Sequence, residues 1–187
     1  MDALPHRPLH RPLTEARLLL QSRDAANGRI LATRRVRNTL MRSGAELVAG
    51  LFNGTLTTPV NALAVGLNPD PSAPPYEVTA LTTTAGDGTT LLERPAAALA
   101  GDAFSSTLDA EGFRVVLKIH GVLPAGRAVS PDAEVDSVEI GEAALGVLAP
   151  DGETLARIYN RVAFEPLPKR RNHELAFYWE VDFPYGT

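Results

Sequence analysis

The sequence contains no cysteine among its 187 residues. That absence excludes disulfide bridges, iron–sulfur clusters, thiolate zinc sites and cysteine nucleophiles. The chain also has no run of about 18 apolar residues, the length that a membrane-spanning helix needs. Its first residues lack the apolar core of a secretory signal. We therefore expect neither membrane contact nor export.

Nucleotide-binding motifs are missing as well. The chain has 15 glycines, but none of them belongs to a GxxxxGKS, GxxxxGKT or GxGxxG pattern that would cradle phosphates. The densest glycine cluster, residues 85–89, lies between two expected strands, where Asp87-Gly88 predicts a turn. The sequence thus gives no reason to expect a nucleotide cofactor.

Catalytic and metal-binding patterns are also scarce. No GxSxG sequence places a serine nucleophile on a strand-to-helix turn. Proline between His6 and His10 denies these histidines the helix that would bring them to one face. His120 is expected on the same strand face as Arg114 and Lys118, whose charges disfavour a metal cation. We predict a non-enzymatic protein with no metal and no cofactor; carboxylates that meet only in space are the one hydrolytic route left open.

Charge is distributed unevenly along the chain. Residues 1–43 carry nine arginines and three acids, a net charge of +6. Residues 44–187 carry nine basic and nineteen acidic side chains, a net charge of −10. This division predicts a basic N-terminal segment attached to an acidic body.

The basic segment opens with a proline-rich stretch. Residues 4–13 read LPHRPLHRPL, and their three prolines exclude a helix interior, so we expect an extended arm. A short helix is predicted to start at Thr14, a suitable N-cap, and to end at Asn27-Gly28. Such an arm is suited to wrapping around a partner.

A second helix is predicted over residues 33–52. Its apolar residues recur at three-, four- and seven-residue spacings on one face, and Asn53-Gly54 follows as a stop. Gly44 inside it costs about 1 kcal/mol relative to alanine. The glycine therefore predicts either a kink or the close approach of another backbone.

From residue 55 onward, short runs rich in β-branched residues alternate with turns that contain proline and glycine. This texture predicts a mainly β protein: an antiparallel β-sandwich or jelly-roll-like domain over residues 55–187, preceded by the arm and one or two α-helices in residues 1–54. The predicted strands are residues 61–67, 76–84, 89–93, 103–108, 112–123, 134–140, 153–164 and 173–183.

The last two predicted strands alternate apolar and polar residues with a period of two. If they form a hairpin, Arg157 and Arg161 on one strand face Glu174 and Glu180 on the other, which would stabilise the pairing by about 0.2–1 kcal/mol for each pair. The alternation predicts which side chains of each strand point into the core.

The basic residues are the candidates for partner contacts. Nucleic acid is an alternative partner, but the body is acidic and residues 1–43 contain no aromatic ring on which bases could stack. We therefore favour a protein partner. The expected contact residues are Arg7, Arg11, Arg34, Arg35 and Arg37, with Lys169, Arg170 and Arg171 as a second patch on a hairpin tip.

Two segments resemble a known family. Residues 61–81, NALAVGLNPDPSAPPYEVTAL, combine a hydrophobic strand, a glycine, a loop of small residues and prolines, and Thr-Ala-Leu. Residues 138–164 end in LARIYNRVAF, followed by Phe164-Glu-Pro, Lys169 and the terminal Trp179-Glu-Val-Asp-Phe strand. This arrangement is similar to small structural virion proteins of tailed bacteriophages and phage-tail-like particles.

The resemblance implies a non-enzymatic structural subunit of a tail, neck, fibre base or capsid surface. It would be located in the virion, assembled in the host cytoplasm as a homo-oligomer, and bound to other virion or tail proteins. The alternative is a receptor- or glycan-binding module displayed on a particle. That alternative would place the aromatic rings of Tyr76, Tyr159 and Tyr178 on one ligand face.

Overall fold

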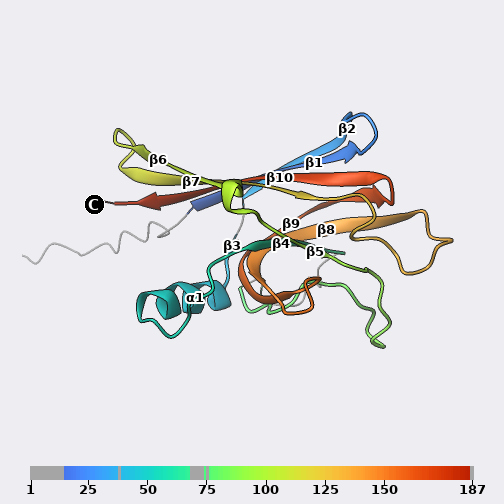
Figure 1. Cartoon of the computed structure of the whole chain (residues 1–187), viewed down its shortest axis with the longest axis horizontal. Helices are drawn as coiled ribbons and strands as arrows, with labels where there is room; N and C mark the ends of the chain where they lie inside the picture. The colour runs from blue at the N-terminus through green and yellow to red at the C-terminus, as the bar shows by residue number, and fades with distance from the viewer. Residues whose placement is uncertain (1–14, 38, 68–73, 75, 186–187) are drawn as a thin grey trace, which may run out of the picture.

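The computed structural model describes residues 15–37, 39–67, 74 and 76–185. Within them the chain forms two five-stranded antiparallel sheets that lie one above the other, with a helix beside the lower sheet (Figure 1). The prediction of a mainly β, sandwich-like protein is confirmed.

The upper layer, sheet A, has the strand order β2-β1-β10-β7-β6. The two ends of the described chain lie side by side in it, because β1 pairs with β10 over its whole length. The predicted assembly segment of residues 1–54 therefore shares a sheet with the predicted β domain. The strands are β1 (Glu15–Asp24), β2 (Ile30–Arg37), β6 (Phe104–Asp109), β7 (Arg114–Leu123) and β10 (His173–Pro184).

The lower layer, sheet B, has the strand order β3-β9-β8-β4-β5. Its centre is the long pair β8 and β9, in which three register shifts bend the strands. The strands are β3 (Thr39–Leu40), β4 (Ala62–Gly66), β5 (Ala96–Ala98), β8 (Ser137–Leu148) and β9 (Leu155–Arg170); a short 3₁₀ helix, η1 (Gly101–Ala103), precedes β6.

The main core lies between the sheets. Phe177 and Trp179 of β10 point inward and stack at 5.7 Å, whereas Tyr178 between them points outward, as the alternation of apolar and polar residues predicts. Leu63 and Leu145 of sheet B meet them from below. The interior is thus built from alternate residues of both sheets.

The helix α1 (Arg42–Phe52) packs against sheet B at a glycine. A side chain at Gly44 would collide with the backbone carbonyl of Tyr159 in β9. The hydroxyl of Ser43 donates to the carbonyl of Ile158 at 2.6 Å, which holds the same turn against the strand. Of the two expectations for Gly44, the close approach of another backbone is the one observed.

Both predicted helices need correction. Residues 15–24, expected to be helical, form β1, and the expected helix over residues 33–52 divides into the end of β2, the short β3 and α1. Leu18, Leu20 and Ser22 are buried while their neighbours are less so, which is the period of a strand. Pairing with β10 overrides the local capping signal at Thr14. The predicted stop is confirmed, since Asn53 caps α1 and Gly54 has φ +75°.

The predicted strands over residues 76–84 and 89–93 are wrong. Neither segment forms a strand of the two sheets. They contact each other through an isolated bridge between Thr84 and Thr90 and through the N–H groups of Leu91 and Leu92, which donate to the carbonyl of Thr83. The turn between them is confirmed, because Gly88 has φ +86° and its N–H donates to Ala85 at 3.0 Å. Val78 and Leu81 of the first segment pack on the outer side of sheet B, whereas Leu92 of the second is buried in the main core.

The predicted hairpin between the last two strands is also wrong. β9 pairs with β8 in sheet B, whereas β10 pairs with β1 and β7 in sheet A. Arg161 therefore does not face Glu180. It forms a buried ion pair at 2.5 Å with Glu142 of β8, whose other carboxylate oxygen accepts the N–H of Thr82. This pair fastens the segment around Thr82 to the outer side of sheet B.

Candidate functional site

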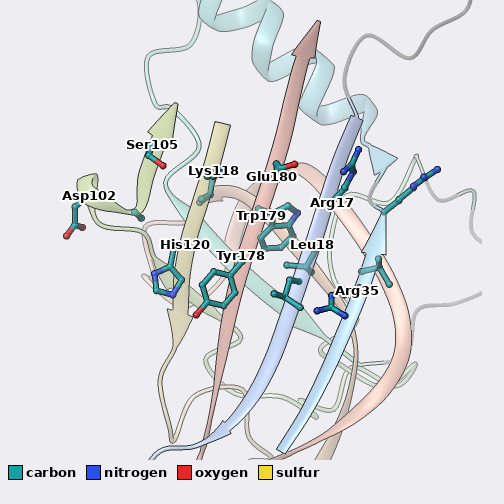
Figure 2. A pocket seen from close by; sticks show the side chains of 15 residues that line it. Arg17, Leu18, Arg35, Asp102, Ser105, Lys118, His120, Tyr178, Trp179 and Glu180 are labelled. Atoms are coloured by element: carbon teal, nitrogen blue, oxygen red, sulfur yellow. The ribbon is translucent and has the colours of Figure 1, made fainter. Parts of the chain in front are cut away.

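The outer face of sheet A carries a hollow of about 700 Å³ (Figure 2). Two rows of outward side chains form its walls, because residues opposite one another in paired strands share a face. Its floor is the backbone at positions such as Leu18 and Trp179, whose side chains point into the core. The first row is Arg35, Leu19, Tyr178 and His120; the second is Arg37, Arg17, Glu180, Lys118 and Ser105.

Contacts with two neighbouring side chains hold Tyr178 in the first row. Its ring stacks on His120, with the ring centroids 4.6 Å apart and the planes 11° from parallel. Its hydroxyl accepts a hydrogen bond from the guanidinium of Arg23 at 2.5 Å. The same guanidinium donates to the side-chain oxygen of Gln21 at 2.6 Å. The wall on this side is therefore held by contacts across three neighbouring strands, β1, β10 and β7.

The hollow is cationic. Four cationic side chains, Arg17, Arg35, Arg37 and Lys118, outnumber the two carboxylates, Asp102 and Glu180. The charged groups of Arg35, Arg37 and Lys118 make no hydrogen bond or ion pair with the residues that the structure describes, and these three residues are exposed. Their charges remain available to an anionic group from outside.

The predicted arginine cluster on residues 34–37 divides between the two faces of β2. Arg35 and Arg37 point outward into the hollow. Arg34 points the other way and donates to the backbone carbonyls of Glu165 and Pro166 in β9 at 2.8 and 2.9 Å. Arg34 thus ties the two sheets together, and the strand geometry separates residues that a helix would have placed on one surface.

The predicted second patch does not form a surface of three cations. Lys169 is 1% exposed, and burial lowers its pKa to about 8. Arg170 is exposed and forms an ion pair at 3.3 Å with Asp136. Arg171 donates to the carbonyls of Ser130 and Asp132. The expectation of a hairpin-tip patch is wrong for Lys169, because alternation along β9 turns its side chain inward.

The two predicted groups of basic residues are also far apart. Along β10, the pairing position of Arg37 and Arg17 is Glu180, whereas Arg171 precedes the start of the strand at His173. Seven residues of strand separate these positions by about 23 Å, at about 3.3 Å per residue. Arg7 and Arg11 lie outside the described residues.

Several residues of the hollow were not expected from the sequence. Arg17 is one of them, because the wrongly predicted helix concealed its outward direction. Tyr178, named above only for the alternative function, lies on the adjacent strand β10. A signal was present, because Arg17, Leu19 and Gln21 alternate with Leu18 and Leu20. The shared face of Lys118 and His120 was expected and is confirmed.

The three tyrosines of the alternative function do not share a face. Tyr159 is buried at 8% exposure in the core, and its burial raises the pKa of the hydroxyl. Tyr76 is 54% exposed beside α1, where its carbonyl accepts the N–H of Arg42. Only Tyr178 of these three lies in the hollow.

Among the described residues, no three histidine or acidic side chains gather as a metal site, and no helix has the length and apolarity to cross a membrane. Comparison of the chain with protein-family models, curated proteins and solved structures found no match.

Proposed function

We propose that this protein is a non-enzymatic structural subunit of a tailed-phage virion or phage-tail-like particle. It binds neighbouring subunits through its basic N-terminal region and through the cationic hollow of sheet A. The observation that carries the proposal is the set of exposed guanidinium and ammonium groups of Arg35, Arg37 and Lys118 around an open hollow. The assignment to a phage particle rests on the sequence resemblance to phage structural proteins.

The charge distribution supports contacts between copies. Residues 44–187 have a net charge of −10, whereas the hollow has more cations than carboxylates. A cationic surface on one copy and an acidic surface on the next attract each other, and repetition of such a contact closes a ring or extends a fibre. Salt weakens an attraction of this kind between exposed charges.

Location in a particle is tested by fractionation. Cells that produce the particles are lysed, the particles are banded in a density gradient, and the chain is detected with an antibody in every fraction. We expect the chain in the particle band of a low-salt gradient and its partial release by a high-salt wash, because salt weakens contacts between exposed charges. Its confinement to the soluble fractions would overturn the proposal.

The contact surface is tested by the light-scattering mass of the purified chain at low and high salt. We expect a defined oligomer at low salt. The triple variant Arg35→Glu/Arg37→Glu/Lys118→Glu should raise the Kd of its self-association at least tenfold. A control variant reverses three exposed cations outside the hollow, Arg29, Arg42 and Arg170. Equal effects of the two triple variants would assign the association to net charge and refute the surface.

A displayed ligand-binding module is the second candidate, and the Tyr178 hollow favours it. Its ring and the adjacent Leu19 are apolar surfaces flanked by cations, which suits an acidic sugar better than a neutral one. A glycan array separates the two functions. Binding that Tyr178→Ala removes, in a chain that stays monomeric at every salt concentration, would support the module in place of the subunit.

A further inference from the structure

One end of sheet A presents an apolar surface on its inner side. We call this surface the overhang: Leu108 is 64% exposed, Phe113 59%, Val115 36% and Tyr185 39%, and the partly buried Phe183 lies among them. Exposure of four large apolar residues at one place is unusual for a free subunit, since such patches mark contact sites.

The strand register places these residues on one face. Leu108 of β6 pairs with Val115 of β7, which pairs with Phe183 of β10. Val115 lies four residues from the inward-pointing Ile119, and Phe183 lies two residues from the inward-pointing Val181, so both point toward sheet B. Leu108 shares their face because it pairs with Val115. Figure 1 shows this end, with the β6–β7 hairpin and the C-terminal end of β10, projecting past the strands of sheet B.

The overhang belongs to an ordered end of the sheet. On the opposite, outer face Arg114 donates to the carboxylates of Asp109 at 2.8 Å and Asp182 at 2.7 Å. The hydrogen bond from Arg114 holds the pKa of Asp109 below its usual range. On the inner face the ring of Phe113 meets Tyr185 edge-on at 6.2 Å. A fixed hairpin therefore presents an apolar surface of defined shape.

The sequence supplies a matching segment. Residues 4–13 hold three leucines among prolines and basic residues, and they precede β1. β1 begins at Glu15, which pairs with Asp182, one residue before Phe183 of the overhang. Prolines lack the N–H that a further sheet strand would need, so this segment would bind a sheet face through its side chains.

The direction of β1 decides which copy the segment reaches. Glu15, the first residue of β1, lies at the end of sheet A that carries the overhang, because it pairs with Asp182. Three prolines disfavour a sharp reversal, and ten residues of extended polyproline geometry span about 30 Å. A segment of that length can reach a second copy, whereas covering the chain's own overhang requires the segment to turn back on itself.

We propose that residues 4–13 of a second copy cover the overhang, with Leu4, Leu9 and Leu13 packed against Leu108, Val115 and Phe183. This inference rests on the proposed role as a subunit that assembles with copies of itself. It assigns the arm an apolar receptor surface, separate from the cationic hollow on the other face of the sheet.

The absence of native cysteine makes a crosslinking test direct. A chain with Leu9→Cys and a size-tagged chain with Leu108→Cys are mixed in the full-length protein and treated with a short bismaleimide. Only a contact between two molecules yields the mixed dimer. The matched control is Thr107→Cys, an exposed neighbour on the opposite face of β6. We expect at least fivefold more mixed dimer with position 108 than with position 107.

Two outcomes would overturn the inference. Equal yields at positions 107 and 108 would show that the arm does not recognise the overhang. In the double variant Leu9→Cys/Leu108→Cys, a crosslink within one molecule whose yield is unchanged on dilution would show that the arm covers its own chain. Both positions on β6 are exposed, and circular dichroism checks that the variants remain folded.

The outcome is independent of the particle test. If the chain is found in the particle band but gives no mixed dimer, the proposed function is supported and the arm contact is refuted. A mixed dimer from a chain that is absent from particles would support the arm contact and contradict the proposed location in a virion.

Discussion

The outer faces of the two sheets differ. On sheet B, α1 and the segment around Thr82 cover the face, and a second apolar cluster and the Glu142–Arg161 ion pair are buried beneath them. On sheet A, the face is open, hollowed and cationic. A covered face contributes to folding, whereas an open charged face is available for binding. Changes on sheet B should therefore alter stability, and changes on sheet A should alter association.

The largest effect is expected at the buried ion pair. Glu142 is 0% exposed, so Glu142→Ala leaves the charge of Arg161 and the N–H of Thr82 without their acceptor. We expect a loss of about 3–5 kcal/mol in the free energy of unfolding by urea. The control on sheet A, Glu180→Ala, should change it by less than about 0.5 kcal/mol.

A double variant sharpens this prediction. Glu142→Leu with Arg161→Leu removes both charges and should restore most of the lost stability, because the cost arises from an unpaired buried charge. If the double variant is as unstable as the single one, the packing of the covering segment, and not the charge, holds this face.

Two lysines contrast the interior with the hollow. The pKa of Lys169 is about 8 in the folded chain against 10.5 for an ordinary lysine, so the unfolded chain binds more protons between these values. Stability should therefore rise as the pH increases from about 8 to 10.5. One pKa unit corresponds to about 1.4 kcal/mol, so Lys169→Met should stabilise the fold by up to about 3 kcal/mol at pH 7.

The control for this prediction is Lys118→Met in the hollow. Lys118 is exposed, so its replacement should change the free energy of unfolding by less than about 0.5 kcal/mol. Thermal melts at pH 7 and pH 10.5 provide the measurement. A benefit of Lys169→Met that persists undiminished at pH 10.5 would assign it to packing instead of charge burial.

A smaller loss is expected where α1 meets sheet B. Gly44→Ala inserts a methyl group against the Tyr159 carbonyl and should destabilise the fold by about 1–3 kcal/mol, despite the better helix propensity of alanine. Gly86→Ala, with no atom within 4 Å of the added carbon, is the control and should have little effect. Equal unfolding midpoints would show that α1 moves away from β9 without penalty.

The smallest change in stability is expected in the hollow itself. Reversal of Arg35, Arg37 and Lys118 removes no described hydrogen bond, so the unfolding free energy should change by less than about 0.5 kcal/mol. The same variant should weaken self-association most strongly. A large loss of stability would show that these cations support the sheet and would remove the contrast between the two faces.

Much of the fold was predictable from short-range patterns. Alternation along residues 173–183 identified which side chains point inward, and the turn at Asp87-Gly88 follows from its residue types. The predicted helix over residues 14–27 failed because three consecutive leucines satisfy both helical and strand periods in so short a segment. Leu18 pairs with Trp179 of β10, 161 residues away, and this pairing selects the strand over the helix.

The candidate site was less accessible to sequence reasoning. Arg35 and Arg37 were identified as basic and free to bind, but their neighbours Lys118 and Tyr178 come from strands that meet them only in the folded sheet. Lys169 was predicted to be exposed because two further basic residues, Arg170 and Arg171, follow it. One position along a strand reverses the direction of a side chain, so the exact register decides burial.

The sequence by itself determined the β class, the turns and the basic N-terminal segment, because alternation, glycine conformation and net charge act over a few residues. The tertiary structure alone decided that β1 joins β10, that Arg161 is paired with Glu142, and that cations from β1, β2 and β7 surround one hollow. These features depend on pairing between distant strands, and its free energy comes from the apolar surface buried between the two sheets.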